Sequence, residues 1–236
     1  MSAPQQSNVR NRLLRALSPD DFAWLRPRLH AIATELRQTL IAPEAPIRTL
    51  YFPEDGLASI VSGVAGKVEI GVVGRKGLVG AAPVLLDVDR TPFHLFVQCP
   101  GEMLAIDVAD LLAAADARPT LRALLLRYVQ TLMLQTAQTA FVNAAYNIDA
   151  RLARWLLMCH DRLDGDDLAL THDFLALMLG AQRSSTTLAV QALEGHGLIR
   201  ARRGRITILD RAALEAVADE GYGLPEREYA RLIEGS

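Results

Sequence analysis

Apolar residues recur with two different periods along the chain, one typical of strands and one typical of helices. Between residues 41 and 107, short runs of β-branched, aromatic and other apolar residues are separated by turns that contain Gly and Pro. Short strands at this spacing predict a β-roll or small barrel. The predicted strands are residues 47–52, 57–62, 67–73, 93–98 and 102–107, and the predicted turns include residues 63–66.

Helical spacing occurs on both sides of this β-rich segment. Residues 9–17 carry leucines at helical spacing, and Pro19 after a serine predicts the start of a second helix. Residues 105–115 are apolar and predict a helix, and a longer helical pattern covers residues 119–146. Residues 150–163 form another amphipathic pattern. Strands followed by helices predict an α+β fold.

The long helical pattern lacks charge over most of its length, which raises the question of a membrane span. No charged residue lies between Tyr128 and Ile148, but eight Gln, Thr and Asn residues do. These polar side chains disfavour lipid, so we expect no membrane contact and a dimerisation helix instead. The alternative is a helix buried within a monomer. The predicted apolar stripe is Leu121, Leu125, Tyr128, Leu132, Val142 and Tyr146.

A helix-turn-helix is predicted between residues 170 and 195. Thr171 can cap a short helix that has Asp173 in its first turn, and Gly180 suits the turn that ends it. A second helix starts near Gln182. Two helices joined by a tight glycine turn are typical of a DNA-binding motif. The expected inward side of the second helix is Leu188, Val190, Ala192 and Leu193, and its polar side is Gln182, Arg183, Ser184 and Thr187.

A basic hairpin follows the two helices. The β-rich runs 198–200 and 206–209 are joined by a turn that contains two arginines and a glycine, which predicts a wing. Between Arg183 and Arg205 there are five Arg and one Glu, a balance of 5 − 1 = +4 in a chain whose net charge is −2. A local positive patch favours phosphate binding. The alternative is an ordinary helical hairpin with a solvated basic turn.

The stretch LGAQRSSTTLAVQALEGHGLI, residues 179–199, resembles the winged helix-turn-helix of the CRP/FNR family of bacterial transcription regulators. This resemblance implies a homodimer that binds an inverted repeat in double-stranded DNA, with RNA polymerase as a further partner. It puts Arg183 at the base-reading position, whereas Ser184 and Leu188 stand where some members carry Glu and a second Arg. The expected DNA-binding residues are Thr171, Gln182, Arg183, Ser184, Ser185, Thr187, Arg203 and Arg205.

A resemblance to the family's sensory β-roll extends over IRTLYFPEDG and GRKGLVGAAPVLLDVDRTPF. Members that bind cyclic AMP have a Glu directly after a Gly, and then an Arg and a hydroxyl residue. Here Ala81 replaces that Glu, which removes a charge-assisted bond to the ribose. We therefore expect no response to cyclic AMP, and the effector, if there is one, is an unknown small molecule. The candidate effector-pocket residues are Gly80, Ala81, Arg90, Thr91 and Thr136.

Other chemistries lack the residues that they need. Two cysteines cannot supply the four thiolates of an iron–sulfur cluster, and five histidines without paired spacing give a cupin-like, metal-dependent enzyme no ligand set. That enzyme is the alternative function; we expect no catalytic residue, metal or cofactor. The amino terminus lacks a signal pattern, which favours a cytoplasmic protein.

The predicted organisation has three parts. They are the amino-terminal helices and cyclic-nucleotide-binding-like β-roll (1–118), the dimerisation helix (119–147) and the DNA-binding domain with a helical tail (148–236). From residue 210 the tail carries seven acids and three Arg, a balance of 3 − 7 = −4. We expect a solvated helical addition that does not contact DNA.

Overall fold

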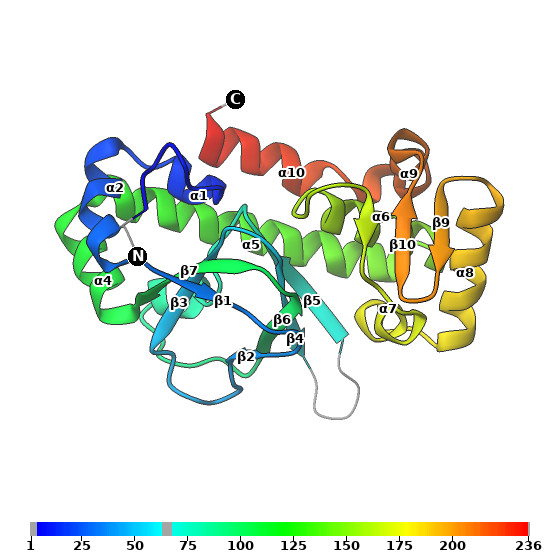
Figure 1. Cartoon of the computed structure of the whole chain (residues 1–236), viewed down its shortest axis with the longest axis horizontal. Coiled ribbons are helices and arrows are strands. Elements are labelled where there is room, and N and C mark those ends of the chain that lie inside the picture. Colours follow the sequence, from blue (N-terminus) through cyan, green and yellow to red (C-terminus); the bar gives the residue numbers. More distant parts are fainter. Residues whose placement is uncertain (1–3, 63–67, 236) are drawn as a thin grey trace.

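The amino-terminal half forms a β-roll of two antiparallel sheets, as the short apolar runs predict (Figure 1). The computed structural model describes residues 4–62 and 68–235, so the predicted turn at 63–66 lies outside the described residues. One sheet has the order β1 (His30–Ala33), β7 (Glu102–Asp107), β3 (Thr49–Pro53). The other has the order β2 (Thr39–Ile41), β6 (His94–Cys99), β4 (Leu57–Ser62), β5 (Val68–Val73).

The strand predictions hold for β3 to β7, with ends that differ by up to two residues. The sequence patterns missed β1 and β2. β1 is mostly exposed and β2 has three residues, so neither gives a buried alternating pattern. The predicted helix at 105–115 is wrong at its start, because residues 105–107 belong to β7 and helix α4 spans Val108–Ala117. The prediction failed there because an apolar run such as residues 105–107 occurs in a buried strand as well as in a helix.

Short helices cover the end of the β-roll that lies away from the carboxy-terminal domain (Figure 1). The helix predicted at 9–17 is only one turn, α1 (Arg12–Arg15). Ser18 caps α2 (Pro19–Leu25) as predicted, because its side chain accepts a hydrogen bond from the amide of Asp21. A 3-10 turn, η1 (Arg26–Arg28), leads into β1, and α3 (Ala81–Leu85) lies between β5 and β6.

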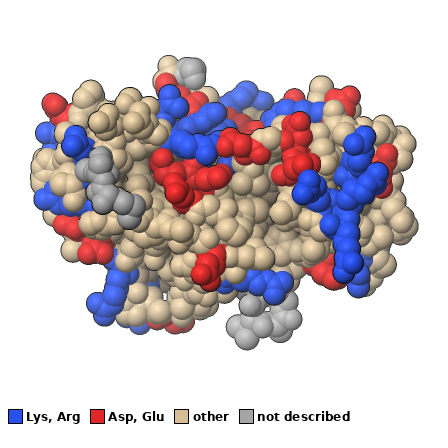
Figure 2. All heavy atoms as spheres, in the orientation of Figure 1, with Lys and Arg blue, Asp and Glu red and all other residues tan. Residues whose placement is uncertain are grey.

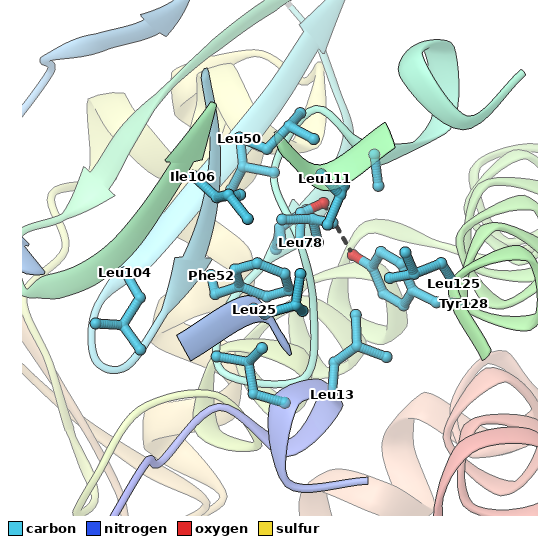
Figure 3. Close-up of a cluster of buried hydrophobic side chains, with 14 of the residues drawn as sticks. Leu13, Leu25, Leu50, Phe52, Leu78, Leu104, Ile106, Leu111, Leu125 and Tyr128 are labelled. Carbon is cyan, nitrogen blue, oxygen red and sulfur yellow. Dashed lines mark hydrogen bonds between the residues drawn. The ribbon is translucent and has the colours of Figure 1, made fainter. Parts of the chain in front are cut away.

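The first hydrophobic core lies between these helices and the sheets. Figure 3 shows Leu13, Leu25 and Phe52 side by side in it, with Tyr128 entering from the long helix α5 (Pro119–Ala145). The Tyr128 hydroxyl donates a 3.5 Å hydrogen bond to the carbonyl of Leu78. Burial of this much apolar surface fixes α5 against the β-roll.

The apolar stripe predicted as the self-association seam of α5 faces its own chain. Leu121, Leu125, Tyr128 and Val142 are all buried within the protomer. The polar positions in the stripe are satisfied there as well, since Gln135 Nε2 donates to the carbonyl of Val72 at 3.2 Å. The prediction that this stripe forms a seam between two chains is therefore wrong.

The carboxy-terminal half is built on α6 (Ile148–His160), whose first turn is capped by the side chain of Asn147. A second core joins α6 to the elements that follow it and to Val61 and Phe96 of the β-roll. Those elements are β8 (Asp167–Leu168), α7 (His172–Leu179), α8 (Arg183–Gly195), β9 (Ile199–Arg202), β10 (Arg205–Ile208) and α9 (Arg211–Ala218).

The carboxy-terminal tail is packed, so the expectation of a solvated addition is wrong. Leu214 of α9 is buried against α6, and Tyr229 and Ile233 join the first core. Figure 1 shows the tail running back along α5. Its apolar residues outweigh the effect of its acidic charge, because the acids lie toward the surface. The tail elements after α9 are η2 (Asp219–Gly221), α10 (Leu224–Tyr229) and the π-helical turn η3 (Ala230–Glu234).

Candidate nucleic-acid interface

The helices α7 and α8 form the predicted helix-turn-helix. Thr171 caps α7 by accepting a hydrogen bond from the amide of Phe174 at 3.2 Å. Gly180 ends α7 with a φ of 57°, a left-handed conformation that favours glycine. The turn is tight, and α8 begins three residues later at Arg183. The Thr171 cap thus fixes the start of α7, and Gly180 forms the turn that leads into α8.

Helix α8 has one buried face and one open face. Thr186, Ala189, Val190 and Leu193 are buried against α6, α7 and the wing strand β9. Leu188 is 66% exposed, so its predicted inward position is wrong. Its position follows from helical geometry, because Leu188 is one turn after Ser184, which is exposed.

The predicted DNA-binding residues of α8 lie along or beside its open face. Gln182, Arg183 and Ser184 are exposed, and Ser185 and Thr187 are half-buried. The hydroxyl of Thr187 lies 3.3 Å from His172 Nδ1, which links α8 to the start of α7. The structure therefore brings these five residues together, with Leu188 beside them.

The predicted wing is a hairpin of β9 and β10 joined by Arg203 and Gly204. Gly204 has a φ of 72°, which suits a two-residue turn. A third strand, β8, pairs with β10; the sequence patterns missed it because it has only two residues, directly after an acidic turn. Pairing with β8 fixes the wing to the helical core.

A band of arginine side chains runs over the wing. Figure 2 shows it as a continuous blue surface at the end of the molecule that holds β9 and β10. The exposed residues Arg200, Arg202, Arg203 and Arg205 form this band. Two of them, Arg200 and Arg202, are absent from the predicted set of DNA-binding residues, although the local charge balance included them. The band gives the open face of α8 a basic neighbour.

Several of these arginines are paired with carboxylates at the surface. Arg183 Nε lies 2.9 Å from Asp173 Oδ1, and both side chains are about 70% exposed. Arg205 Nη1 lies 3.1 Å from Asp167 Oδ2. Exposed pairs of this kind contribute little to stability. Phosphates or base edges can therefore compete for these guanidinium groups at small cost.

The candidate effector residues also come together, in a second place. Gly80, Ala81, Arg90, Thr91 and Thr136 all line one cavity between the β-roll and α5, which we call the β-roll cavity. Its volume is about 650 Å³. Thr136 is far from the other four residues in the sequence, but the packing of α5 on the β-roll brings it to the same cavity.

The nucleotide cassette keeps its arginine but not its carboxylate. Gly80 has a φ of 85°, but the next residue, Ala81, is buried and offers no carboxylate. Arg90 holds Asp89 with two hydrogen bonds of 3.0 and 3.1 Å, and these bonds lower the pKa of the Asp89 carboxyl. The exposed Arg90–Asp89 pair leaves the arginine in place, so the feature that the cassette lacks is the carboxylate that would hold a ribose.

Residues 4–62 and 68–235, the ranges that the structure describes, contain neither a helix suited to cross a membrane nor a cluster of metal-ligating side chains. None of the helices in these ranges has both the length and the apolar character that a bilayer crossing requires. No group of three or more His, Cys, Asp or Glu side chains in the same ranges is arranged to hold a metal ion.

Comparison with known proteins adds a family to this geometry. Residues 150–217 match the Crp-like helix-turn-helix domain. The chain is similar to the Global nitrogen regulator of Nostoc sp., with 24% identity over 184 residues that cover 74% of this chain and 82% of the relative.

Two solved structures share the fold. FixK2 from Bradyrhizobium japonicum superposes with a TM-score of 0.70 at 13% identity, covering 81% of this chain and 98% of that one. A transcriptional regulator of the CRP/FNR family from Thermus thermophilus gives 0.63 at 17% identity, covering 82% and 100%.

The helix-turn-helix, its wing and the basic band define a DNA-binding protein. With the β-roll, the long helix and the match to the Crp-like domain, they define its class more closely. The carboxy-terminal part has a Crp-like helix-turn-helix domain, and the chain has the fold of transcription regulators of the CRP/FNR type.

Proposed function

We propose that this regulator binds DNA in a sequence-specific manner, as a homodimer on an inverted-repeat site. The observation that carries the proposal is the open face of α8 beside the arginine band of the wing. An exposed helix face of this size fits the major groove, and a two-fold dimer requires half-sites about one helical turn apart.

Two roles are distributed over this surface. Arg183 donates two hydrogen bonds to a guanine edge, and Gln182, Ser184, Ser185 and Thr187 contact neighbouring bases or phosphates. Thr171, Arg203 and Arg205 bind the backbone phosphates. The exposure of Arg183 and its replaceable partner Asp173 support the first role.

The surface proposed for self-association is a stripe on α5 other than the one predicted. Its seven exposed residues follow one another at alternating spacings of three and four, the pattern of a coiled-coil seam. Leu126 and Met133 are 38% and 61% exposed in the single chain. The seam consists of Ala123, Leu126, Gln130, Met133, Ala137, Ala140 and Ala144.

Three further parts of the proposal concern effectors, chemistry and organisation. The loss of the cassette carboxylate at Ala81 supports a regulator that does not respond to cyclic AMP. We propose no enzymatic activity, a cytoplasmic location and RNA polymerase as a further partner. We also propose the three-part division at residues 1–118, 119–147 and 148–236.

The test separates base reading from backbone binding. Fragments selected from random DNA by the purified protein define a cognate site. On that site Arg183→Ala loses about 1–3 kcal/mol of binding free energy but loses little on random DNA. Arg203→Ala, the control for a phosphate contact, weakens binding to both. Equal losses of Arg183→Ala on the two DNAs would reject the base-reading role.

A further inference from the structure

The wall of the β-roll cavity is mainly apolar. Strands β4, β5 and β6 contribute Ile60, Ile70 and Leu95, and α5 contributes Val129 and Leu132. A volume of about 650 Å³ lies within the range of about 300–1,000 Å³ that small-molecule sites occupy. The cavity therefore has both the size and the surface of a site for a hydrophobic molecule.

Large apolar side chains stand exposed at the mouth of the cavity. Leu86 and Val88, in the loop after α3, are 59% and 48% exposed, and Met133 of α5 is 61% exposed. A cluster of exposed apolar side chains around a hollow marks a binding surface rather than ordinary solvent-facing structure. A molecule that enters the cavity covers part of this cluster.

The polar groups of the lining already have partners within the chain. Thr136 Oγ1 donates to the carbonyl of Leu132 at 3.0 Å, and Thr91 Oγ1 accepts from the amide of Phe93 at 3.3 Å. Arg90 is held by Asp89. Arg90 is the one cationic side chain among the described lining residues, and its exposed pair with Asp89 balances that charge. The lining thus favours an uncharged ligand over a phosphate.

A second copy of the chain does not fill this space. Where the proposed seam of α5 passes the cavity, its residues are Met133, Ala137 and Ala140. One Met and two Ala side chains from a partner helix are together too small to occupy a volume of about 650 Å³. A partner helix on this seam covers the mouth and leaves the interior open.

We propose that the β-roll cavity binds an uncharged, mainly hydrophobic small molecule and does not bind nucleotides. The role of this ligand as an effector rests on the proposed function of the chain as a DNA-binding regulator. Its binding, however, depends only on the β-roll and α5, and it is measured without DNA.

The experiment uses the purified full-length chain and the neutral fluorescent probe N-phenyl-1-naphthylamine. We expect saturable binding of one probe per chain, with displacement by n-decanol. Decanoate, which carries a charge, displaces the probe at least about tenfold less well, and cyclic AMP does not displace it. Absence of saturable binding, or displacement by cyclic AMP as effective as that by n-decanol, would overturn the proposal.

Two variants locate the probe and one controls for surface charge. Ile70→Arg places an unpaired charge in the wall, and Ala82→Phe fills space next to α3; each weakens probe binding by about tenfold or more. Leu36→Arg adds the same charge at a residue that is 61% exposed and outside the lining, and binding is unchanged. Circular dichroism verifies that each variant is folded.

Wild-type affinity retained in both cavity variants would place the probe elsewhere and overturn the proposal. Probe binding that appears only in a monomeric variant would show that a second copy occupies the cavity, which also overturns it. A mobility shift without probe tests the DNA-binding function separately, so the two proposals fail independently.

Discussion

Leu188 is a large hydrophobic side chain on the open face of a helix that is otherwise polar there. Exposure of 66% leaves most of its surface in water in the free protein. The neighbours on that face, Arg183, Ser184 and Thr187, are suited to hydrogen bonding. In the major groove, the apolar group available to such a residue is the methyl group of thymine. We therefore expect Leu188 to add a preference for thymine that hydrogen bonds cannot supply.

We expect Leu188→Ala to remove the response of the protein to a thymine methyl group. Replacing the contacted thymine by deoxyuridine in the selected site costs the wild type about 0.8 kcal/mol, the value of one buried methylene, or roughly fourfold in affinity. The variant is indifferent to that replacement. Titration by fluorescence anisotropy, with each thymine of the half-site replaced in turn, measures both effects.

Leu36→Ala provides the control for this experiment. Leu36 is 61% exposed, close to the exposure of Leu188, but lies between β1 and β2 of the β-roll. Its variant should keep the wild-type response to deoxyuridine. A wild type that tolerates deoxyuridine at every position would contradict a methyl contact by Leu188.

Residue identities predicted the local features of this site more fully than its long-range ones. Thr171 and Gly180 act within a few residues of themselves, so their effects are visible in the sequence. The pairing of Arg205 with Asp167 depends on strand β8, because Asp167 belongs to β8 and lies 38 residues before Arg205 in the sequence. The inward assignment of Leu188 failed because hydrophobicity alone does not give the direction of a side chain on an amphipathic helix.

At the scale of elements, α5 has apolar residues on two faces, and only packing determines which face is free. The stripe with the larger side chains, including Leu121, Leu125 and Tyr128, gave the stronger signal and was assigned to a partner chain. The β-roll and the tail cover that stripe instead. The open stripe is rich in alanine, so its hydrophobic signal in the sequence was weak. The element was thus predictable, and its orientation was not.

We expect Leu126→Glu to shift the protein from dimer to monomer. The variant brings a carboxylate from each chain to a seam of small apolar residues, where burying unpaired charge is costly. Sedimentation velocity measures the shift, and affinity for the inverted repeat falls together with dimerisation.

The control is Leu177→Glu, since Leu177 on α7 is 37% exposed and Leu126 is 38% exposed. This variant carries the same new charge and remains dimeric. A Leu126→Glu protein that sediments like the wild type would remove the proposed seam on α5.

At the scale of the whole molecule, the β-roll and the DNA-binding half are joined by a buried polar contact as well as by the tail. Glu69 of β5 accepts a 2.6 Å hydrogen bond from Trp155 Nε1 of α6 and a 2.7 Å bond from Ser59 Oγ. The tail adds a bond of 2.8 Å from Gln138 Nε2 of α5 to the carbonyl of Glu220. The contact between β5 and α6 thus includes a carboxylate that only long-range folding buries.

Burial raises the pKa of Glu69 to about 7, because the charged form loses its hydration. The hydrogen bonds from Ser59 and Trp155, and the charges of Arg162 and Arg154, lower the pKa but do not offset burial. The neighbouring thiols of Cys99 and Cys159 stay uncharged, since burial raises their pKa as well. The junction therefore accommodates a protonated Glu69 better than an ionised one.

The sign of the resulting pH dependence follows from proton linkage. Glu69 binds its proton more tightly in the folded chain, where its pKa is about 7, than in the unfolded chain, where it is near 4.5. Below the unfolded pKa both states are protonated and Glu69 adds no pH dependence. As the pH rises toward 7 the folded chain loses up to about 3 kcal/mol of stability from this group. Above that range the loss is constant.

We expect Glu69→Gln to remove this contribution, because the amide keeps the shape and the two bonding positions of the protonated carboxyl without titrating. Urea unfolding is followed by the fluorescence of Trp155, with the Trp24→Phe protein as the reference and as the background of the variant. The free energy of unfolding of the variant should be close to that of the reference at about pH 5 and higher at about pH 8. Glu102→Gln, which removes an exposed carboxyl from β7, should follow the reference at both pH values. If Glu69→Gln and the reference protein lose stability equally between the two pH values, Glu69 does not make the junction sensitive to pH. The packing of the tail and the second core would then hold the two halves together independently of Glu69.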